Sequence, residues 1–540
     1  MRSTRFILQV LIIILAFAIT ACGTKQPEEK QQSEAVIVYN LGTEPKTLDP
    51  AKASGKPEMT VLAALFDGLV RYNKNNELIK GSGMAVDWTV SPDGLKYVFK
   101  LRQDAKWSNG DPVTANDFEF AWKRLLAPET GAEYAYQLFY LKNGQKYHEG
   151  KVTADQVGVR AINSYTLEVE LEFPTPYFIA LTATTNLVPL NRKVVEANPD
   201  WHSAVETYVS NGPFSLASWQ HHQRLVLKKN PTYWDASSVN LDKLIITMVE
   251  SRDTELIMFQ NNEIDIGENP PLQEMRRLIS EGVATVTTDP STYYYIFNTA
   301  KPPFNDVRVR KALAYAIDRK AITENVLQAG QKPALAFVPY GFSDGGPGKD
   351  FRKIGGNYFK DNDVSKARAL LAEAGYPGGA GFPEIEFLYN TNESHKKIAE
   401  AIAHMWKENL GIRVRLINQE WGVYLNNRFQ GNFQLTWSGW GPDYPDPMTF
   451  LNVYVSDGGH NETNWGSPQY DELINRARKS GNNIERFAYM HEAEKILMDE
   501  MPIMPIYFYV NVTLYKPWVK GVFSPTFGPM QEFKWASVKK

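Results

Sequence analysis

Strand-like and helix-like segments alternate through the second half of the chain, and this alternation is the feature that most constrains its fold. Tyr293–Phe297 (YYYIF) and Ile412–Leu416 have the composition of strands. The pattern of helices is instead found in Lys301–Arg319, Ser365–Ala374 and His395–Leu410. Repeated strand, helix, strand order predicts an α/β fold with a mixed sheet.

The first half carries further short elements of both kinds. The expected strands are Val36–Tyr39, Leu95–Arg102, Tyr165–Leu171, Leu244–Val249 and Glu263–Gly267, with a late one at Tyr507–Leu514. The expected helices are Met59–Leu69, Phe118–Leu126 and Asp253–Asn261. A chain of 540 residues is long enough for two or more domains with substantial cores.

The N-terminus has the pattern of an export signal. A basic start precedes the apolar run Phe6–Ala18, which is too short to span a bilayer comfortably. Residues 1–21 are therefore predicted to be a signal peptide, with an N-terminal anchor helix as the alternative. Cys22 is the only cysteine, which excludes an internal disulfide and a cysteine-rich metal site. Its position resembles the lipobox of bacterial lipoproteins, which implies lipid on Cys22 and a polar tether over residues 22–35.

Composition restricts the class of ligand. The formal net charge is −3, so nothing in the charge balance indicates nucleic acid as a partner. Aromatic residues make up 12% of the chain, a share that suits both large cores and pockets that accept varied ligands.

The segment Trp437–Phe450 (WSGWGPDYPDPMTF) combines acids, rings, glycines and prolines. Because proline fixes φ and glycine allows close approach of the backbone, we expect a stiff, irregular loop. Asp443 or Asp446 on such a loop could hold a small cation such as an α-amino group. The alternative is an ordinary surface turn, since Asp, Gly and Pro are common turn residues.

No motif predicts an enzyme. Gly341–Gly345 (GFSDG) matches the G-x-S-x-G pattern, but it lies in a Pro/Gly-rich loop without a following helix. The glycines up to Lys349 lack phosphate-loop spacing, and none of the eight histidines forms an H-E-x-x-H zinc helix. Among 61 acidic residues no spacing selects a catalytic pair. We therefore predict neither a catalytic residue, nor a bound metal, nor a cofactor.

Several segments together resemble one protein family, the oligopeptide-binding lipoproteins that serve ABC importers (bacterial extracellular solute-binding proteins, family 5). They are Leu101–Arg124, Ser210–Phe214, Thr292–Leu313, Tyr389–Lys397, Asn418–Trp421, Gly439–Pro447 and Pro505–Asn511. The resemblance implies a bilobed, three-domain α/β fold that closes around a peptide. It places domain I in residues 36–66, 191–290 and 511–540, domain II in residues 67–190 and domain III in residues 291–510.

The resemblance also assigns ligand contacts. It implies that Asp443 takes the peptide's α-amino group and that Gly439, Trp440 and Gly441 pair with the ligand backbone. It implies pocket rings at Tyr134, Trp421, Tyr294 and Tyr509, and contacts to the far end of longer ligands at Arg428 and His395. Core packing is the alternative for each ring, and a solvated position at a helix start is the alternative for His395.

Some positions depart from enteric relatives. Ser291 and Gly441 occupy the places of a cysteine pair, Trp437 replaces an arginine, and Lys56 replaces an apolar residue. Loss of the arginine leaves the recognition of the ligand's carboxylate, and hence peptide length, open. The implied partners are a peptide and ABC permease subunits, at the outer face of a Gram-positive-type cell membrane, with the chain as a monomer. Other solutes (a nickel chelate, haem or a sugar), a signalling-peptide receptor and a surface hydrolase remain alternatives.

Overall fold

The computed structural model describes residues 34–539 except Asn269, Pro347 and Asp457. The predicted signal peptide, Cys22 and all but the last residues of the predicted tether lie outside this range. Ala35–Lys540 forms one compact unit. No helix in the described part is long and apolar enough to cross a membrane.

One large mixed sheet runs through this unit, in the order β13-β12-β14-β10-β15-β9-β1-β8-β7-β6, with β11 also on β15. Its strands are β1 (Val36–Asn40), β6 (Phe214–Gln220), β7 (Arg224–Lys229), β8 (Lys243–Thr247), β9 (Ile266–Glu268), β10 (Ala284–Phe297), β11 (Lys332–Pro333), β12 (Ile385–Asn390), β13 (Val414–Gln419), β14 (Leu435–Trp440) and β15 (Ile503–Tyr515). β1 runs parallel to β8 and β9, and β12 parallel to β13 and β14, whereas β10, β14 and β15 pair antiparallel. The mixed α/β fold expected from the sequence is confirmed.

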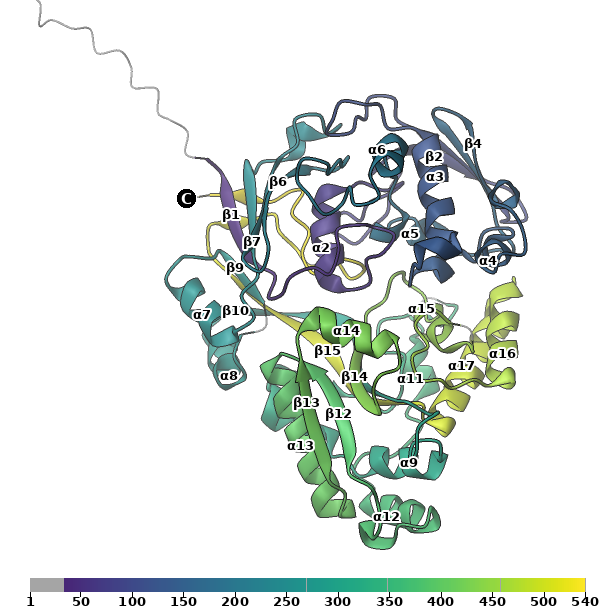
Figure 1. Ribbon diagram of the computed structural model, residues 1–540, viewed down its shortest axis with the longest axis vertical. Helices are drawn as coiled ribbons and strands as arrows, with labels where there is room; N and C mark the ends of the chain where they lie inside the picture. Colours follow the sequence, from purple (N-terminus) through teal and green to yellow (C-terminus); the bar gives the residue numbers. More distant parts are fainter. Residues whose placement is uncertain (1–33, 269, 347, 457, 540) are drawn as a thin grey trace, which may run out of the picture. The chain divides into compact units, whose positions relative to one another are not determined.

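The long strands β10 and β15 connect the two lobes of this unit (Figure 1). Their ladder runs from Ala284 to Thr288 and from Thr292 to Ile296, with one register shift inside the second stretch, between Tyr293 and Tyr294, and an interruption between Thr288 and Thr292. Pro290 lies in this interruption, where it has no N–H to give to a ladder. The expected domain boundaries at 290/291 and 510/511 fall in this crossing, and remain predictions.

The upper lobe in Figure 1 also holds a four-stranded antiparallel sheet in the order β2-β3-β5-β4. The strands of this sheet are β2 (Ala85–Val90), β3 (Lys96–Leu101), β4 (Val159–Asn163) and β5 (Thr166–Glu170). The α-helices of this lobe are α2 (Lys56–Leu65), α3 (Ala115–Leu126), α4 (Gly144–His148), α5 (Phe178–Leu181) and α6 (Arg192–Ala197). Thr114 and Asp117 form the capping box that starts α3. Phe118 and Trp122 on α3 are fully buried and anchor this helix in the core.

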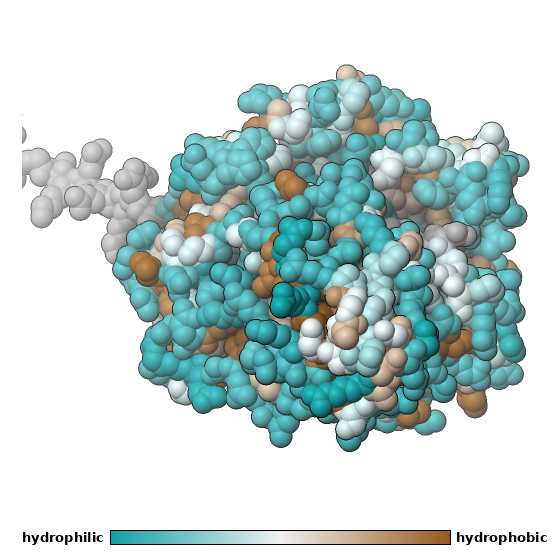
Figure 2. Space-filling model, turned by 60° about the horizontal axis from the view of Figure 1, so that its bottom comes forward, coloured by the Kyte–Doolittle hydropathy of each residue, from teal (hydrophilic) through white to brown (hydrophobic). Residues whose placement is uncertain are grey.

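The remaining helices cover the rest of the large sheet. They are α7 (Arg252–Gln260), α8 (Leu272–Ser280), α9 (Val307–Tyr315), α10 (Arg319–Ala321), α11 (Phe351–Gly355), α12 (Val364–Glu373), α13 (Glu393–Leu410), α14 (Trp421–Phe429), α15 (Met448–Leu451), α16 (Pro468–Lys479) and α17 (Asn483–Glu500). A small hairpin, β16 (Val519–Lys520) with β17 (Ser537–Val538), lies near the C-terminus. Figure 2 shows a mostly polar face with apolar side chains scattered over it, as is normal for a folded domain.

The structure corrects one local expectation. Trp437–Trp440 is not part of an irregular loop but forms the second half of β14, paired antiparallel with Thr292–Tyr295 of β10. Pairing with a long neighbouring strand outweighs the low strand propensity of Gly439. Only the stretch after Trp440 is irregular, as far as Met448, where α15 begins.

Candidate functional site

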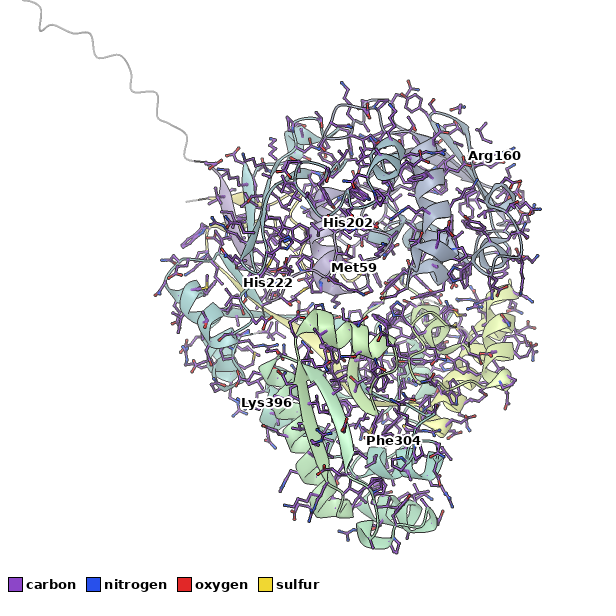
Figure 3. The ribbon with its side chains drawn as sticks, in the orientation of Figure 1. Met59, Arg160, His202, His222, Phe304 and Lys396 are labelled. Carbon is purple, nitrogen blue, oxygen red and sulfur yellow. The ribbon has the colours of Figure 1, made fainter. Side chains whose placement is uncertain are left out.

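A cavity of about 370 Å³ lies at the crossing of β10 and β15 and is lined from both lobes. Nine of the ten residues predicted to bind peptide line it: Tyr134, His395, Trp421, Arg428, Gly439, Trp440, Gly441, Asp443 and Tyr509. Met59, labelled in Figure 3 at the lower end of α2, lines it from the upper lobe. A Cβ on Gly55, beside α2, would lie 3.4 Å from Trp421 of α14, so the two lobes approach each other closely here.

Tyr294 does not line the cavity among the described residues. Successive side chains of a strand point to opposite faces of the sheet, and Tyr294 lies on the face opposite Tyr293. Its ring packs edge-on against Phe337 and Tyr454 and is fully buried. Tyr294 therefore packs in the core, as the alternative for each ring expected. A direct contact between Tyr294 and the ligand is still a prediction.

Asp443 is a buried carboxylate without a cationic partner among the described residues. Its side chain lies in the cavity wall and is 7% exposed. Burial raises its pKa to about 7, an effect that the side chains of Gln137 and Thr449 oppose. The Thr449 hydroxyl also accepts a 3.1 Å hydrogen bond from the Asp443 backbone, which fixes the loop. A bound cation would compensate this carboxylate and favour its charged form.

Asp446, the competing acid of the same loop, is already paired. Both guanidinium nitrogens of Arg486 donate to it, at 2.6 and 2.8 Å, and the Met448 backbone N–H donates at 2.9 Å. Arg486 is 3% exposed, so this is a buried bidentate pair. Asp446 therefore holds the loop to α17 and has little capacity left for a ligand.

The edge of β14 beside the cavity is open. β12 pairs only with Leu435 and Thr436, so Trp437–Trp440 has no strand on that side in the described part of the chain. The Tyr424 hydroxyl donates to the Trp437 carbonyl. The part of this edge that could pair with another strand therefore begins at Ser438. Gly439 is exposed there, and a Cβ at this position would lie 3.0 Å from the Tyr509 hydroxyl. An extended peptide could add to this edge by main-chain hydrogen bonds.

Rings form a wall near Asp443. Trp440 stacks on Tyr134, with ring centroids 6.4 Å apart and planes 10° apart, and its indole N–H donates to the Thr449 carbonyl. His460 contacts both rings edge-on. Burial and the charge of Arg428 lower the pKa of His460 to about 3, so it is neutral and acts as one more ring of the wall.

A second ring stack marks the other end of the edge. His395 lies 3.7 Å from Trp437 and 5.5 Å from Tyr293, centroid to centroid. Trp437 is held by a 2.9 Å hydrogen bond from its indole N–H to Asn390. Burial lowers the pKa of His395 well below its usual range, with the charge of Arg252 adding to the effect. His395 is thus a neutral, half-buried ring at the start of α13 that stacks on Trp437 and Tyr293.

Arg428 carries a charge that the protein neutralises internally. Its guanidinium lies 2.7 Å from Glu462, and both side chains are largely buried. Burial raises the pKa of Glu462, and the Glu462 carboxylate in turn raises the pKa of Arg428. Each side chain stabilises the charged form of the other. A contact from Arg428 to the far end of a ligand remains a prediction.

Sequence reasoning assigned no ligand role to several cavity residues. Lys56 forms a 2.9 Å ion pair with Asp289, and Ser291 also donates to Asp289. Asp289, Pro290 and Ser291 interrupt an otherwise β-branched and aromatic run in the sequence. This interruption could have predicted an irregularity of the strand at this point. Arg252, the first residue of α7, also lines the cavity, and no motif pointed to it.

Two further acids, Glu255 and Glu268, line the cavity. Glu255 accepts a 2.8 Å hydrogen bond from the Glu268 backbone N–H, and Glu268 accepts from Gln531 at 2.8 Å and from Tyr39 at 3.3 Å. Burial raises the pKa of each to about 7. No group of three or more metal-ligating side chains occurs among the described residues.

The chain was then compared with known proteins. The oligopeptide-binding protein OppA of Bacillus subtilis is 38% identical over 97% of this chain and 98% of its own length. The substrate-binding domain of an oligopeptide ABC transporter from Bacillus anthracis superposes with a TM-score of 0.90 at 34% identity, covering 94% of this chain and 99% of that one.

A second solved structure contains a ligand. Haemophilus influenzae OppA in complex with the peptide RPPGFSPFR superposes with a TM-score of 0.88 at 35% identity, covering 94% of this chain and 99% of that chain. Residues 81–462 match the family described as bacterial extracellular solute-binding proteins, family 5. The chain belongs to this family of solute-binding proteins, with the bilobed fold of its OppA-type members.

Proposed function

We propose that the protein captures oligopeptides outside the cell and delivers them to the permease of an ABC importer. The observation that carries this proposal is Asp443, a buried and unpaired carboxylate directly beyond the open edge of β14. A free α-ammonium group would supply the missing charge through a charge-assisted hydrogen bond. The relatives named as oligopeptide-binding proteins support the same ligand class.

The rest of the cavity suits peptides of varied sequence. Every peptide has the same main chain, so an open strand edge can bind it whatever its side chains are. Ring walls such as Trp440 and Tyr134 offer flat apolar surface and impose little chemical selection on side chains. Gly439, Trp440 and Gly441 would pair with the ligand backbone, while Trp421, Tyr509 and Tyr294 would surround it or support its surroundings.

The protein acts as a binding component and not as an enzyme in this proposal. Ser343 of the G-x-S-x-G match lies in an exposed irregular segment, and no strand leads into it. Peptides incubated with the protein should be retained intact. Peptide cleavage that is lost in Ser343→Ala would contradict the proposal.

Export and lipid attachment through Cys22 would hold the monomeric protein at the outer face of the cell membrane, beside its permease. The sequence pattern around Cys22 supports this placement. Cys22→Ser should release the protein into the medium. A variant that is correctly cleaved and still bound to membranes would contradict lipid attachment at this residue.

Identification of the co-purified ligand tests the proposed function. The protein is purified without refolding, denatured, and its released small molecules are identified by mass spectrometry. We expect a mixture of short peptides with free amino termini. Recovery of a nickel chelate, haem or a sugar, with no peptide binding in titrations, would overturn the function. A single defined peptide would instead favour a signalling receptor.

A further inference from the structure

The basic residues that line the cavity differ in whether an acidic side chain of the protein pairs with them. They are Lys56, Arg252 and Arg428 among the described residues. Lys56 is paired with Asp289 and Arg428 with Glu462. The Arg252 side chain has neither an ion pair nor a hydrogen bond to the described residues, so it is the only Lys or Arg of the described lining in this condition.

Arg252 lies in a setting that makes its charge costly. Burial lowers its pKa, and the groups whose charges act on it are Glu255, Glu393, Tyr507 and Tyr509. Glu393 is committed to Lys397 at 2.8 Å, and Glu255 accepts the Glu268 backbone N–H. An incompletely paired guanidinium in such a setting pays a desolvation penalty that an incoming anion would offset.

Asp443 and Arg252 are thus two side chains of opposite charge in the cavity lining that form no ion pair with the described residues; the acids Glu250, Glu255 and Glu268 line the cavity as well. Asp443 lies beyond the C-terminal end of β14. Arg252 begins α7, which lies in Figure 1 on the side of α13 and away from α15. Lys397 of α13 donates to Gln273 of the next helix, α8, and His395 of α13 stacks on Trp437, so Arg252 belongs to the opposite end of the edge. The open edge runs between these two ends. Such an arrangement matches a molecule with an ammonium group at one end and a carboxylate at the other.

Resting on the proposed function, we propose that Arg252 binds the C-terminal carboxylate of the peptide, so that the site selects short peptides with both termini free. A guanidinium can donate two parallel hydrogen bonds to a carboxylate, which fixes both its position and its orientation. Arg252 thus supplies a cation at the end of the cavity where Trp437 has an uncharged ring.

The length of the edge suggests the length of the ligand. From Trp437 to Gly441 an extended strand advances by about 13 Å at roughly 3.3 Å per residue. A peptide lying along it with its ends at Asp443 and Arg252 would contain on the order of four residues. Longer peptides would carry their carboxylate past Arg252 and lose this contact.

The experiment removes the charge of Arg252 and the charge of the ligand's C-terminal carboxylate, each alone and both together. Alanine peptides of two to six residues, as free acids and as C-terminal amides, are titrated into wild type, Arg252→Gln and Arg252→Lys by calorimetry. In the wild type, amidation should weaken binding of peptides near four residues about ten- to a hundredfold. In Arg252→Gln acid and amide should bind alike, and Arg252→Lys should retain part of the preference.

Controls separate this role from a structural one. Arg276→Gln makes the same substitution at an exposed residue of neighbouring α8 that does not line the cavity, and it should keep the wild-type preference. Unchanged melting temperatures show that the variants fold. An Ala-Ala-Glu-Ala amide tests whether Arg252 binds an acidic side chain instead.

The outcomes are distinguishable. An amidation penalty that stays the same in Arg252→Gln, with peptides still bound, would overturn the role of Arg252 and leave the proposed function intact. Rescue of binding by the internal glutamate alone would also overturn it, in favour of side-chain recognition. Absence of binding by every peptide to the folded wild type would overturn the proposed function itself.

Discussion

Asp443 and Asp446 lie on the same loop, yet only Asp446 is met by a guanidinium, that of Arg486 at 2.6 and 2.8 Å. The same kind of side chain therefore has two different uses within three residues. One carboxylate fastens the loop to α17, and the other, at the cavity wall, has no cation beside it among the residues that the structure describes. This difference leads to opposite expectations for stability and for binding.

The first prediction concerns stability. Asp446→Ala leaves Arg486 buried without its partner, which should lower the free energy of unfolding by about 3–5 kcal/mol. Asp443→Ala removes a buried, unpaired carboxylate, so the ligand-free protein should be as stable as the wild type or more stable. Chemical denaturation of ligand-free protein measures both. A larger loss for Asp443→Ala than for Asp446→Ala would contradict the assignment.

The second prediction concerns binding of the amino terminus. Asp443→Ala should weaken binding of a free peptide by about 2–5 kcal/mol, because its ammonium group is left in the cavity without a partner. N-acetylation of the peptide removes the other member of the pair. The acetylated peptide should gain little from an intact Asp443, so the two losses are strongly non-additive in calorimetric titrations. Additive losses would mean that the two groups do not meet.

The third prediction concerns pH. With the empty cavity, Asp443 has a pKa of about 7, and a bound ammonium would lower it. Below pH 7 the carboxyl must lose its proton before it can pair. Affinity should therefore fall as pH decreases from 7 to 5, by at most about tenfold per pH unit, while the peptide amine stays charged.

Glu255 and Glu268 also titrate near pH 7, so the comparison with a variant is essential. The pH dependence that disappears in Asp443→Asn is the part due to Asp443. Calorimetry in two buffers of different ionisation enthalpy should show proton release on binding to the wild type at pH 6. Equal proton release in Asp443→Asn would assign the effect to other groups.

The fourth prediction tests the strand edge. A Cβ at Gly439 would meet the Tyr509 hydroxyl at 3.0 Å, tighter than ordinary contact, whereas the ring carbons lie at 3.5 and 3.6 Å. Gly439→Ala should displace Tyr509 or the edge and weaken peptide binding about tenfold. Adding Tyr509→Phe removes the closest atom and should restore part of the affinity. Full wild-type affinity in Gly439→Ala would show that this edge does not need its close approach.

Local elements were predictable where the sequence carried its own start and stop signals. Thr114 caps α3 and Asp306 caps α9, and each is followed by a buried apolar stripe. Gly411 ends α13 in the left-handed conformation, directly after Leu410, where the expected helix also ended. These signals are local and need no knowledge of distant residues. The strands expected at Val36–Tyr39, Tyr165–Leu171 and Leu244–Val249 are confirmed as β1, β5 and β8, and their signal was likewise local, in their own strand-like composition.

Features that depend on distant residues were not predictable. The second half of β14 forms because β10, more than a hundred residues earlier in the chain, pairs with it. Composition alone could not separate Asp446 from Asp443, which only the family resemblance singled out, and the physical reason appears in the structure, where Arg486 lies beside Asp446. Arg252 has no distinguishing neighbours in sequence, and only the missing partner in the folded cavity identifies it. Charge compensation is a property of three-dimensional environment, and sequence pattern does not contain it.

The open edge of β14 has a further consequence, for stereochemistry. A site that recognises amides along a strand ignores the identity of side chains but not the handedness of the α-carbon. A D-residue in the middle of an extended ligand would turn its side chain toward the strand or distort the ladder. The protein would then filter peptides by chirality while accepting almost any composition of L-residues.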